Sequence, residues 1–192
     1  MNGQGVHDAA CGPVDYAFVA MSAGNSHACG LCSDASITCW GDNRYGQARP
    51  PGGSFTAISA GTVHSCGLRS DATVVCWGDN RYNRYGQTDA PAGTFAAVSA
   101  GGTHSCGLRG DATVSCWGDN EYGQTDAPAG TFAAVSAGWG SSYALRSDAT
   151  VTGWGSLAID LQGRTNNRPA TQSRRRLRGS PGGPVRNFVY RA

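Results

Sequence analysis

A short unit recurs along the chain, and this repetition restricts the fold more than any other feature of the sequence. The tripeptide Ser-Ala-Gly occurs four times at spacings of 37, 40 and 37 residues, beginning at Ser22, Ser59, Ser99 and Ser136. The longer spacing comes from a duplicated Asn-Arg-Tyr within residues 79–87, and an insertion that leaves its flanks intact is expected in a surface loop. A period of this length is typical of solenoids and propellers.

The residues within each unit favour strands over helices. In the third unit the apolar residues form short blocks, over residues 95–100, 104–108 and 113–117, with turn-forming residues between them. Glutamate occurs once and lysine is absent, so residues that favour surface helices are scarce. A sheet of three or four such strands has two apolar faces, which neighbouring copies must cover. The residues expected to fill the spaces between the sheets are Trp40, Trp77, Trp117 and Trp154.

The longest repeated string lies in residues 100–124 and identifies a family. It reads Ala-Gly-x-x-His-Ser-Cys-Gly-Leu-x-x-Asp-Ala-Thr-Val-x-Cys-Trp-Gly-Asp-Asn-x-Tyr-Gly-Gln and resembles the repeat of the regulator-of-chromosome-condensation family. The resemblance extends over residues 18–155 and is greatest to the compact bacterial members, which include a secreted propeller that inhibits β-lactamases. It implies an all-β propeller. The family ring has seven blades, whereas this chain has about four units.

We therefore expect an incomplete or open β-propeller of about four short antiparallel blades. A fragment, an open arc and half of an assembly all fit this count, and self-association would complete a ring. The predicted parts are an N-terminal segment (1–17), the repeat domain (18–155) and a basic, disordered tail (156–192). The tail prediction rests on charge and composition, because residues 164–192 hold eight arginines and no acid, and are rich in Asn, Pro, Gly and Ser.

The cysteines follow the repeat. Three units each contain two cysteines at the same spacing, and the pairs are Cys29 and Cys39, Cys66 and Cys76, Cys106 and Cys116. If the second and third strands form a hairpin centred on Asp111, the two cysteines of a unit face one another within disulfide range. The fourth unit has Tyr143 and Gly153 at these positions, so both partners are absent together.

Two further cysteines, Cys11 and Cys32, remain and are expected to pair with each other. Disulfides would indicate an oxidising compartment and a secreted protein. Reduced buried thiols are one alternative. A metal site is another, although each unit offers at most three ligands and structural zinc needs four.

The sequence contains no recognisable catalytic motif. A Gly-x-Ser-x-Gly elbow, a phosphate loop and an HExxH helix are all absent from it. We interpret His27, His64 and His104 as hydrogen-bonding scaffold residues, because a residue present in most copies of a repeat usually serves the scaffold. The Asp-Asn pairs that follow Trp-Gly in the first three units, Asp42-Asn43, Asp79-Asn80 and Asp119-Asn120, are interpreted as Asx turns, with calcium binding as a less favoured alternative. No cofactor and no enzymatic activity are expected.

Loop residues that vary while their surroundings repeat are better candidates for contact with a partner. Four of these, Asn25, Thr62, Gly102 and Trp139, follow the Ala-Gly pairs. The others surround the Tyr-Gly-Gln triplets, where arginine and tyrosine have the composition of protein-binding hot spots. The candidate partner-binding residues are Arg44, Tyr45, Arg81, Tyr82, Arg84, Tyr85, Glu121 and Tyr122.

These features together favour a non-enzymatic module, secreted or at the cell surface, that presents its loops to a protein partner. The alternative is a cytoplasmic relative of the nucleotide-exchange and chromatin-docking members of the family. A glycan-acting propeller enzyme is the third interpretation. Nucleic-acid binding through the arginine-rich residues 174–178 is not favoured, because aromatic residues are scarce there. No apolar stretch reaches the roughly 20 residues of a membrane span, and residues 1–8 lack the basic and apolar regions of a signal peptide.

Overall fold

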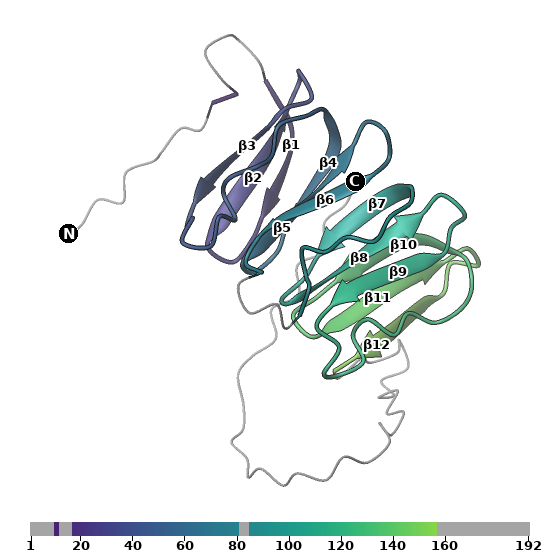
Figure 1. The fold of residues 1–192 in the computed structure, drawn as a ribbon. Helices are drawn as coiled ribbons and strands as arrows, with labels where there is room; N and C mark the ends of the chain where they lie inside the picture. The colour runs from purple at the N-terminus through teal and green to yellow at the C-terminus, as the bar shows by residue number, and fades with distance from the viewer. Residues whose placement is uncertain (1–9, 12–16, 81–84, 157–192) are drawn as a thin grey trace, which may run out of the picture.

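The computed structural model describes residues 10–11, 17–80 and 85–156. Within them it contains four three-stranded antiparallel sheets and no helix (Figure 1). The strands are β1 (Phe18–Ala23), β2 (His27–Cys32), β3 (Ile37–Gly41), β4 (Phe55–Ala60), β5 (His64–Arg69), β6 (Val74–Gly78), β7 (Phe95–Ala100), β8 (His104–Arg109), β9 (Val114–Gly118), β10 (Phe132–Ala137), β11 (Ser141–Arg146) and β12 (Val151–Gly155). Each group of three consecutive strands makes one blade, as the repeat predicts.

The turn between the second and third strands of each blade is built in the same way. In the third blade the Asp111 Oδ1 accepts hydrogen bonds from the backbone N–H and the hydroxyl of Thr113, at 3.0 and 2.7 Å. These bonds stabilise the carboxylate, so the pKa of Asp111 lies below its usual value. The residue between them, Ala112, has a φ of 65°, and an alanine occupies this left-handed position in all four blades.

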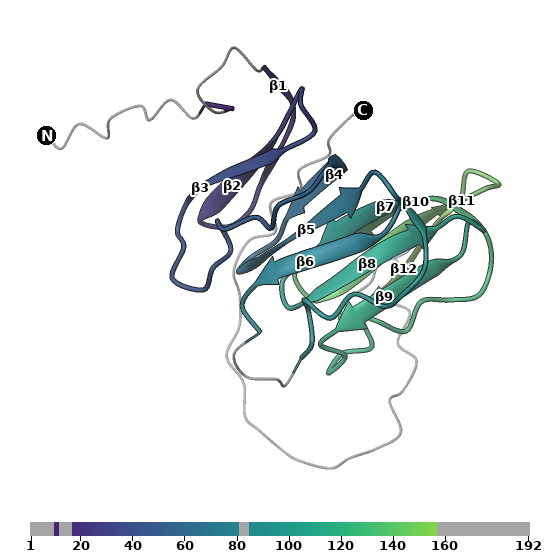
Figure 2. The same ribbon diagram turned by 45° about the horizontal axis from the view of Figure 1, so that its top comes forward.

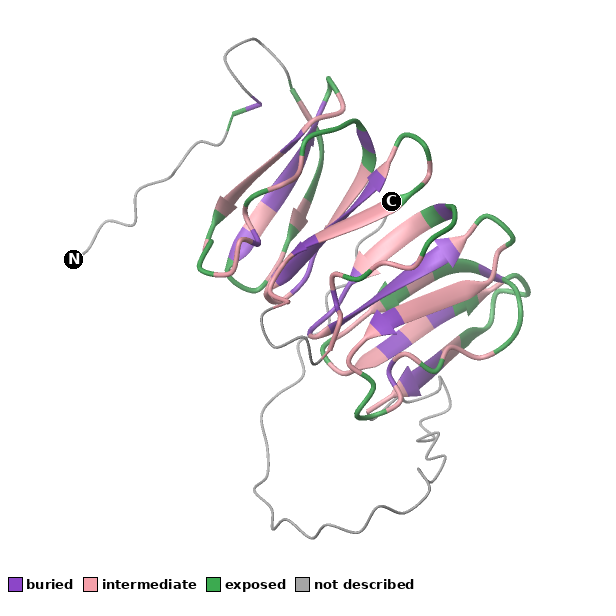
Figure 3. Cartoon of the chain, in the orientation of Figure 1, coloured by how far each residue is buried: buried purple, intermediate pink, exposed green. Residues whose placement is uncertain are grey.

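The blades stack into an open arc, as the sequence predicts (Figures 1 and 2). The first strands of consecutive blades, β1, β4, β7 and β10, lie next to one another. Each of β4, β7 and β10 also packs against the second strand of the preceding blade. The second strands carry half of the buried residues, while most residues of the loops at both ends of the blades are exposed or intermediate (Figure 3).

A separate apolar core fills each space between two blades. Between the first and second blades, Phe55 and Trp77 of the second pack against Cys29, Leu31 and Ile37 of the first. The next two cores repeat this arrangement around Trp117 and Trp154. Three of the four tryptophans thus occupy the expected space between blades, which supplies the cover that an isolated three-stranded sheet lacks.

The fourth tryptophan belongs to the first blade and differs from the others. Trp40 is half-buried and lies against Phe18, with ring centroids 5.8 Å apart. No blade precedes it within the described residues, so Trp40 does not lie between two blades there.

Most of the predicted terminal segments lie outside the described residues. This applies to residues 1–9, 12–16 and 157–192, and therefore to the arginine-rich residues 174–178. The predicted boundaries at 17 and 155 and the predicted disorder of the tail stay predictions. Within the described part of the chain, no helix is long and apolar enough to cross a membrane.

Candidate protein-binding face

Two kinds of loop meet at one end of the blades. One kind joins the first and second strands of a blade, and the other follows the third strand. They are held together by backbone hydrogen bonds, for example from the Asp42 N–H to the Ser26 carbonyl at 2.8 Å, and the second and third blades repeat this bond. We call this end the loop face, and it comprises residues 24–26, 42–50, 61–63, 79–80, 85–90, 101–103, 119–127 and 138–140.

The loop face contains every described residue that the sequence analysis selected as a contact candidate. The varying positions Asn25, Thr62, Gly102 and Trp139 lie in its strand-joining loops. Arg44, Tyr45, Tyr85, Glu121 and Tyr122 lie in the loops that follow the third strands. Arg81, Tyr82 and Arg84 lie outside the described residues, and their role stays a prediction.

A buried glutamine fixes each long loop to the next blade. The Gln47 side chain accepts a hydrogen bond from the Tyr45 N–H at 2.9 Å and donates one to Asp42 at 3.1 Å. Its backbone carbonyl accepts from the Trp77 indole N–H at 2.9 Å and from the Ser65 hydroxyl at 3.2 Å. Gln87 and Gln124 accept the same two bonds from the following blades. The loop face is therefore tied to the blades beneath it.

The Tyr-Gly-Gln triplet is visible in the sequence, whereas this role of the glutamine was not expected. The available signal was that Gln47, Gln87 and Gln124 recur at one position of the repeat, as the histidines do. A recurring polar side chain is a candidate for a buried, hydrogen-bonded position.

The Asp-Asn pairs stabilise the loops as Asx turns, which agrees with the interpretation from sequence. The Asx turns are formed by the aspartates, because the Asp42 Oδ1 accepts from the Arg44 N–H at 3.2 Å and the Asp119 Oδ1 accepts from the Glu121 N–H at 3.0 Å. The asparagines hold the loops over a longer span, since the Oδ1 atoms of Asn43 and Asn120 accept from the N–H five residues on, at 3.1 and 2.9 Å. Asn120 also donates to Asp126 at 2.8 Å. No group of three or more side chains able to hold a metal ion occurs in the described residues.

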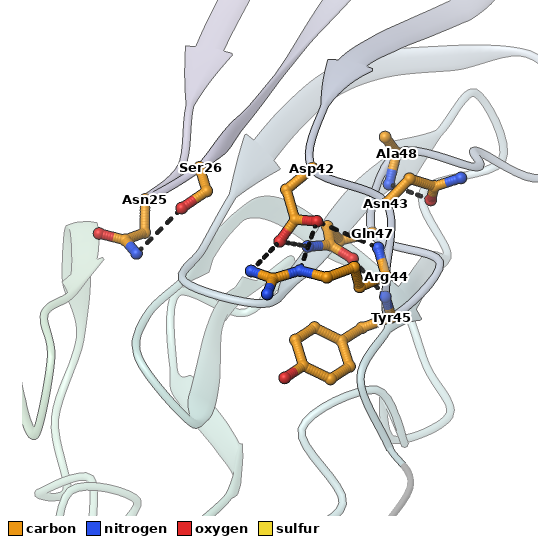
Figure 4. Close-up of polar contacts among 8 residues, drawn as sticks. All are labelled: Asn25, Ser26, Asp42, Asn43, Arg44, Tyr45, Gln47 and Ala48. Atoms are coloured by element: carbon orange, nitrogen blue, oxygen red, sulfur yellow. Dashed lines mark hydrogen bonds and ion pairs between the residues drawn. The ribbon is translucent and has the colours of Figure 1, made fainter.

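In the first blade the exposed Arg44 side chain lies near the ring of the half-buried Tyr45 (Figure 4). The Arg44 guanidinium binds both oxygens of Asp42, with N to O distances of 2.9 Å for each pair. This fork lowers the pKa of Asp42 to about 2. The Arg44 Cζ lies 5.9 Å from the centre of the Tyr45 ring, and the arginine side chain remains 76% exposed. The ion pair fixes the guanidinium without removing it from solvent.

Two exposed aromatic side chains lie on adjacent loops of the third and fourth blades. Trp139 is 81% exposed, the largest value among the exposed large apolar residues of the described chain, and Tyr122 is 56% exposed. A Cβ at Gly102 would lie 2.3 Å from the Trp139 carbonyl oxygen, so the Trp139 loop needs a glycine beneath it. A Cβ at Gly140 would lie 3.8 Å from the Tyr122 ring. The Tyr122 ring therefore lies beside the loop that carries Trp139.

The repeated histidines hold neighbouring blades together beneath the loop face. The Nε2 atoms of His27, His64 and His104 each lie 2.8 Å from a serine hydroxyl of the next blade. Because that hydroxyl donates to the glutamine carbonyl, the histidine N–H donates to the serine. The Nδ1 atoms have no hydrogen-bond partner among the described residues. Burial lowers the pKa of His64 and His104 to about 4, so both are neutral at pH 7. This is a scaffold role.

All eight cysteines form disulfides. Cys29–Cys39, Cys66–Cys76 and Cys106–Cys116 join the second and third strands of the first three blades, each with Cα atoms 4.0 Å apart. Cys11–Cys32 anchors the segment before the first blade, with a Cα separation of 5.7 Å. The three pairs within blades are those that the repeat predicts, and Cys11–Cys32 is the pair expected of the two remaining cysteines, so no free thiol is left. Disulfides of this kind persist in oxidising compartments.

Four stacked, three-stranded blades with inter-blade Phe and Trp cores define an open β-propeller repeat protein. The model of the regulator of chromosome condensation (RCC1) repeat matches residues 18–47, 55–87 and 95–124. The chain therefore contains three copies of this repeat. The fourth blade lies beyond the matched residues, and its strands repeat the same topology. No curated protein sequence is similar enough to this chain to count as a match.

Several solved structures have the same fold. The ectodomain of the receptor kinase CR4 from Physcomitrella patens is 30% identical, with a TM-score of 0.68, over 86% of this chain and 47% of that one. The CRINKLY WD40 ectodomain of the Arabidopsis thaliana receptor kinase ACR4 is 29% identical, with a TM-score of 0.62, over 73% and 53%. Yeast RCC1 (Prp20), solved bound to Kap60, is 18% identical, with a TM-score of 0.64, over 75% and 45%. This chain spans about half the length of these structures.

Proposed function

We propose that this chain is an extracellular protein-binding module that contacts its partner through the loop face. The observation that carries the proposal is the exposed pair Trp139 and Tyr122 on adjacent, well-anchored loops. Trp and Tyr are enriched among the residues that dominate binding energy at protein interfaces. An anchored loop also loses little conformational freedom on binding, which favours affinity.

The disulfides and the similar solved structures support the extracellular part of the proposal. Four disulfides and no free thiol suit an oxidising environment. The two plant structures are receptor ectodomains, at 30% and 29% identity. Yeast RCC1, the protein solved with Kap60, shares the fold at 18% identity. We therefore place the cytoplasmic, exchange-factor-like function second. The proposed module acts by binding, with no catalytic step.

Site-specific photocrosslinking tests the proposal and identifies the partner. A photoreactive benzoylphenylalanine replaces Trp139 in one variant and Ser147, an exposed turn residue at the opposite end of the fourth blade, in the other. Both variants are incubated with the secreted proteins of the source cells and then irradiated. The proposal expects one discrete protein adduct at position 139 and none at position 147. Equal labelling at the two positions, or none at either, overturns it.

The affinity of the captured protein is then measured against matched variants. Trp139→Ala and Tyr122→Ala are each expected to weaken binding at least 30-fold, because truncating an interface hot spot costs about 2 kcal/mol or more. Ser147→Ala serves as the control and is expected to leave the dissociation constant unchanged. Equal affinity of Trp139→Ala and the control would contradict the loop face as the binding site.

A further inference from the structure

The two ends of the arc expose faces that match one another. Each internal contact joins two different surfaces. One carries the Phe and Trp of a blade and faces the preceding blade, and we call it the Phe/Trp face. The other carries the Leu and Cys of the second strand and faces the following blade, and we call it the Leu face. In the first internal contact Phe55 and Trp77 meet Leu31 and Ile37 in this way.

The first blade leaves its Phe/Trp face uncovered within the described residues. Met21 is 69% exposed, whereas Ile58, its equivalent in the second blade, packs at the edge of an inter-blade core. Phe18 and Trp40 are only half-buried, although each later blade buries its Phe to 2% exposure. Ala23 is exposed, and its equivalents Ala60 and Ala100 are buried.

The fourth blade leaves its Leu face uncovered in the same way. Leu145 is 37% exposed, whereas its equivalents Leu31, Leu68 and Leu108 are 6%, 6% and 8% exposed. Val151 is 36% exposed and Ala134 is exposed as well. Within the described residues, the chain thus exposes a Phe/Trp face on its first blade and a Leu face on its fourth. These are the two kinds of surface that pack together in each internal contact.

The polar residues at the two ends match too. Each internal contact contains a buried pair in which His27, His64 or His104 bonds to a serine of the next blade. At the histidine position the fourth blade has Ser141, and at the serine position the first blade has Ala28. A contact between these two ends would therefore contain neither the histidine nor its serine partner. It would leave no buried imidazole without a hydrogen bond, which would be costly in an interior.

Backbone groups complete the match. In the internal contacts a serine hydroxyl of the first strand accepts a hydrogen bond from an alanine N–H of the next blade, as from Ala60 to Ser22 at 2.9 Å and from Ala137 to Ser99 at 3.0 Å. The corresponding acceptor at the end of the arc, Ser136, is exposed. The corresponding donor at its start is the N–H of Ala23.

We propose that the Leu face of the fourth blade packs against the Phe/Trp face of the first blade in a second copy of this chain. Two copies joined head to tail at both ends give a closed, twofold-symmetric dimer. The solved structures of this fold are about twice the length of the aligned chain, so two copies supply a comparable number of blades. The proposal uses the ends of the arc and does not depend on the loop face.

Sedimentation equilibrium of the full chain under non-reducing conditions tests the dimer. Leu145→Arg places a charge on the Leu face, and Met21→Arg places one on the Phe/Trp face. Each variant alone is expected to weaken dimerisation at least 50-fold, because both interfaces of the dimer carry the change. Ser147→Arg, the same charge on an exposed turn, is expected to dimerise like the wild type. Circular dichroism and a thermal melt confirm that each variant is folded.

Mixing the two single variants separates the proposal from its alternatives. Leu145→Arg retains its Phe/Trp face and Met21→Arg retains its Leu face, so the mixture is expected to form a heterodimer with one intact interface. A symmetric contact between two Leu faces would instead leave Met21→Arg dimeric and give no heterodimer, which overturns the proposal. A wild-type chain that is monomeric at all concentrations also overturns the proposal. The end faces would then be covered by other parts of the same molecule.

Discussion

The third and fourth blades have the same strand pairing and different internal reinforcement. The third blade contains the Cys106–Cys116 disulfide and His104, whereas the fourth has Tyr143, Gly153 and Ser141 at these three positions. In both, the register joins equivalent partners, Cys106 with Cys116 and Tyr143 with Gly153. The blade fold therefore does not require the disulfide or the histidine. What the two blades share is a buried Phe and Trp packed on the preceding blade and the same Asp-Ala turn.

The largest effect is expected from the shared packing. Trp117→Ala and Trp154→Ala should each lower the free energy of unfolding by about 3–5 kcal/mol, because each leaves a cavity between two blades. Trp40→Ala should cost less than half of this, since Trp40 is only half-buried. Urea unfolding followed by fluorescence and circular dichroism measures the three values. A Trp154 variant as stable as the wild type would show that the fourth blade is not held by this core.

The next effect concerns pH and the histidines that only the first three blades possess. The pKa of His64 and His104 is about 4 in the folded protein and about 6.5 in an unfolded chain. Above pH 6.5 both states are neutral, and between pH 6.5 and 4 only the unfolded state takes up the proton. The free energy of unfolding should therefore fall as the pH falls from 6.5 to 4, by roughly 3 kcal/mol for each of these two histidines. Below pH 4 they cause no further loss, because the folded and unfolded states are then both protonated.

Urea midpoints at pH 7.5, 5.5 and 4.5 measure this dependence. His104→Gln keeps an amide N–H near Ser142 and cannot titrate, so it should remove the part of the loss that His104 causes and leave the part due to His64 and His27, whose pKa values are also lowered by burial. The aspartates with a lowered pKa contribute little to this slope at pH 4.5 and above, because the stability they supply is lost mainly as the pH falls below the unfolded value of about 4. A slope unchanged in the variant would assign the acid sensitivity to other groups.

The disulfides should rank third. Replacing Cys106 and Cys116 by serine should lower the free energy of unfolding by roughly 2–3 kcal/mol, because the bond closes a short loop in the unfolded chain. The reverse change sharpens the comparison. Tyr143→Cys with Gly153→Cys places two cysteines at paired positions of the fourth blade, and it should gain a similar amount if the new bond forms. Peptide mapping under non-reducing conditions confirms the bond, and chemical denaturation measures its effect.

The smallest effect concerns the turn that all four blades share. Ala112 and Ala149 both have φ near 65°, a conformation that costs an alanine about 1 kcal/mol and glycine almost nothing. Replacing the alanine by glycine removes this cost. Part of the gain in stability is lost, because glycine has more conformational freedom in the unfolded chain. Ala112→Gly and Ala149→Gly should therefore each stabilise the protein by about 0.5 kcal/mol. A destabilisation in a thermal melt would contradict the strain argument.

Much of the fold could be predicted from the sequence because the repeat is so regular. Constant spacing defined the units, and the symmetry of Cys106 and Cys116 about Asp111 fixed the hairpin register. The recurrence of Gln47 in the repeat was a signal that it is buried, but its partners could not be predicted, because its carbonyl meets Trp77 and Ser65 of another blade. The contrast between exposed Leu145 and buried Leu108 was hidden for the same reason. Identical residues differ in burial according to what stacks beside them, which one unit's sequence does not contain.

The central proposal is that this propeller arc is an extracellular module whose first three blades are each closed by a disulfide. The most direct test is mass spectrometry of the unreduced protein after thiol alkylation, followed by peptide mapping. The account predicts that alkylation adds no mass and that the links are Cys11–Cys32, Cys29–Cys39, Cys66–Cys76 and Cys106–Cys116. Eight alkylated cysteines in protein isolated from its native compartment would contradict the claim and favour the cytoplasmic, exchange-factor-like alternative.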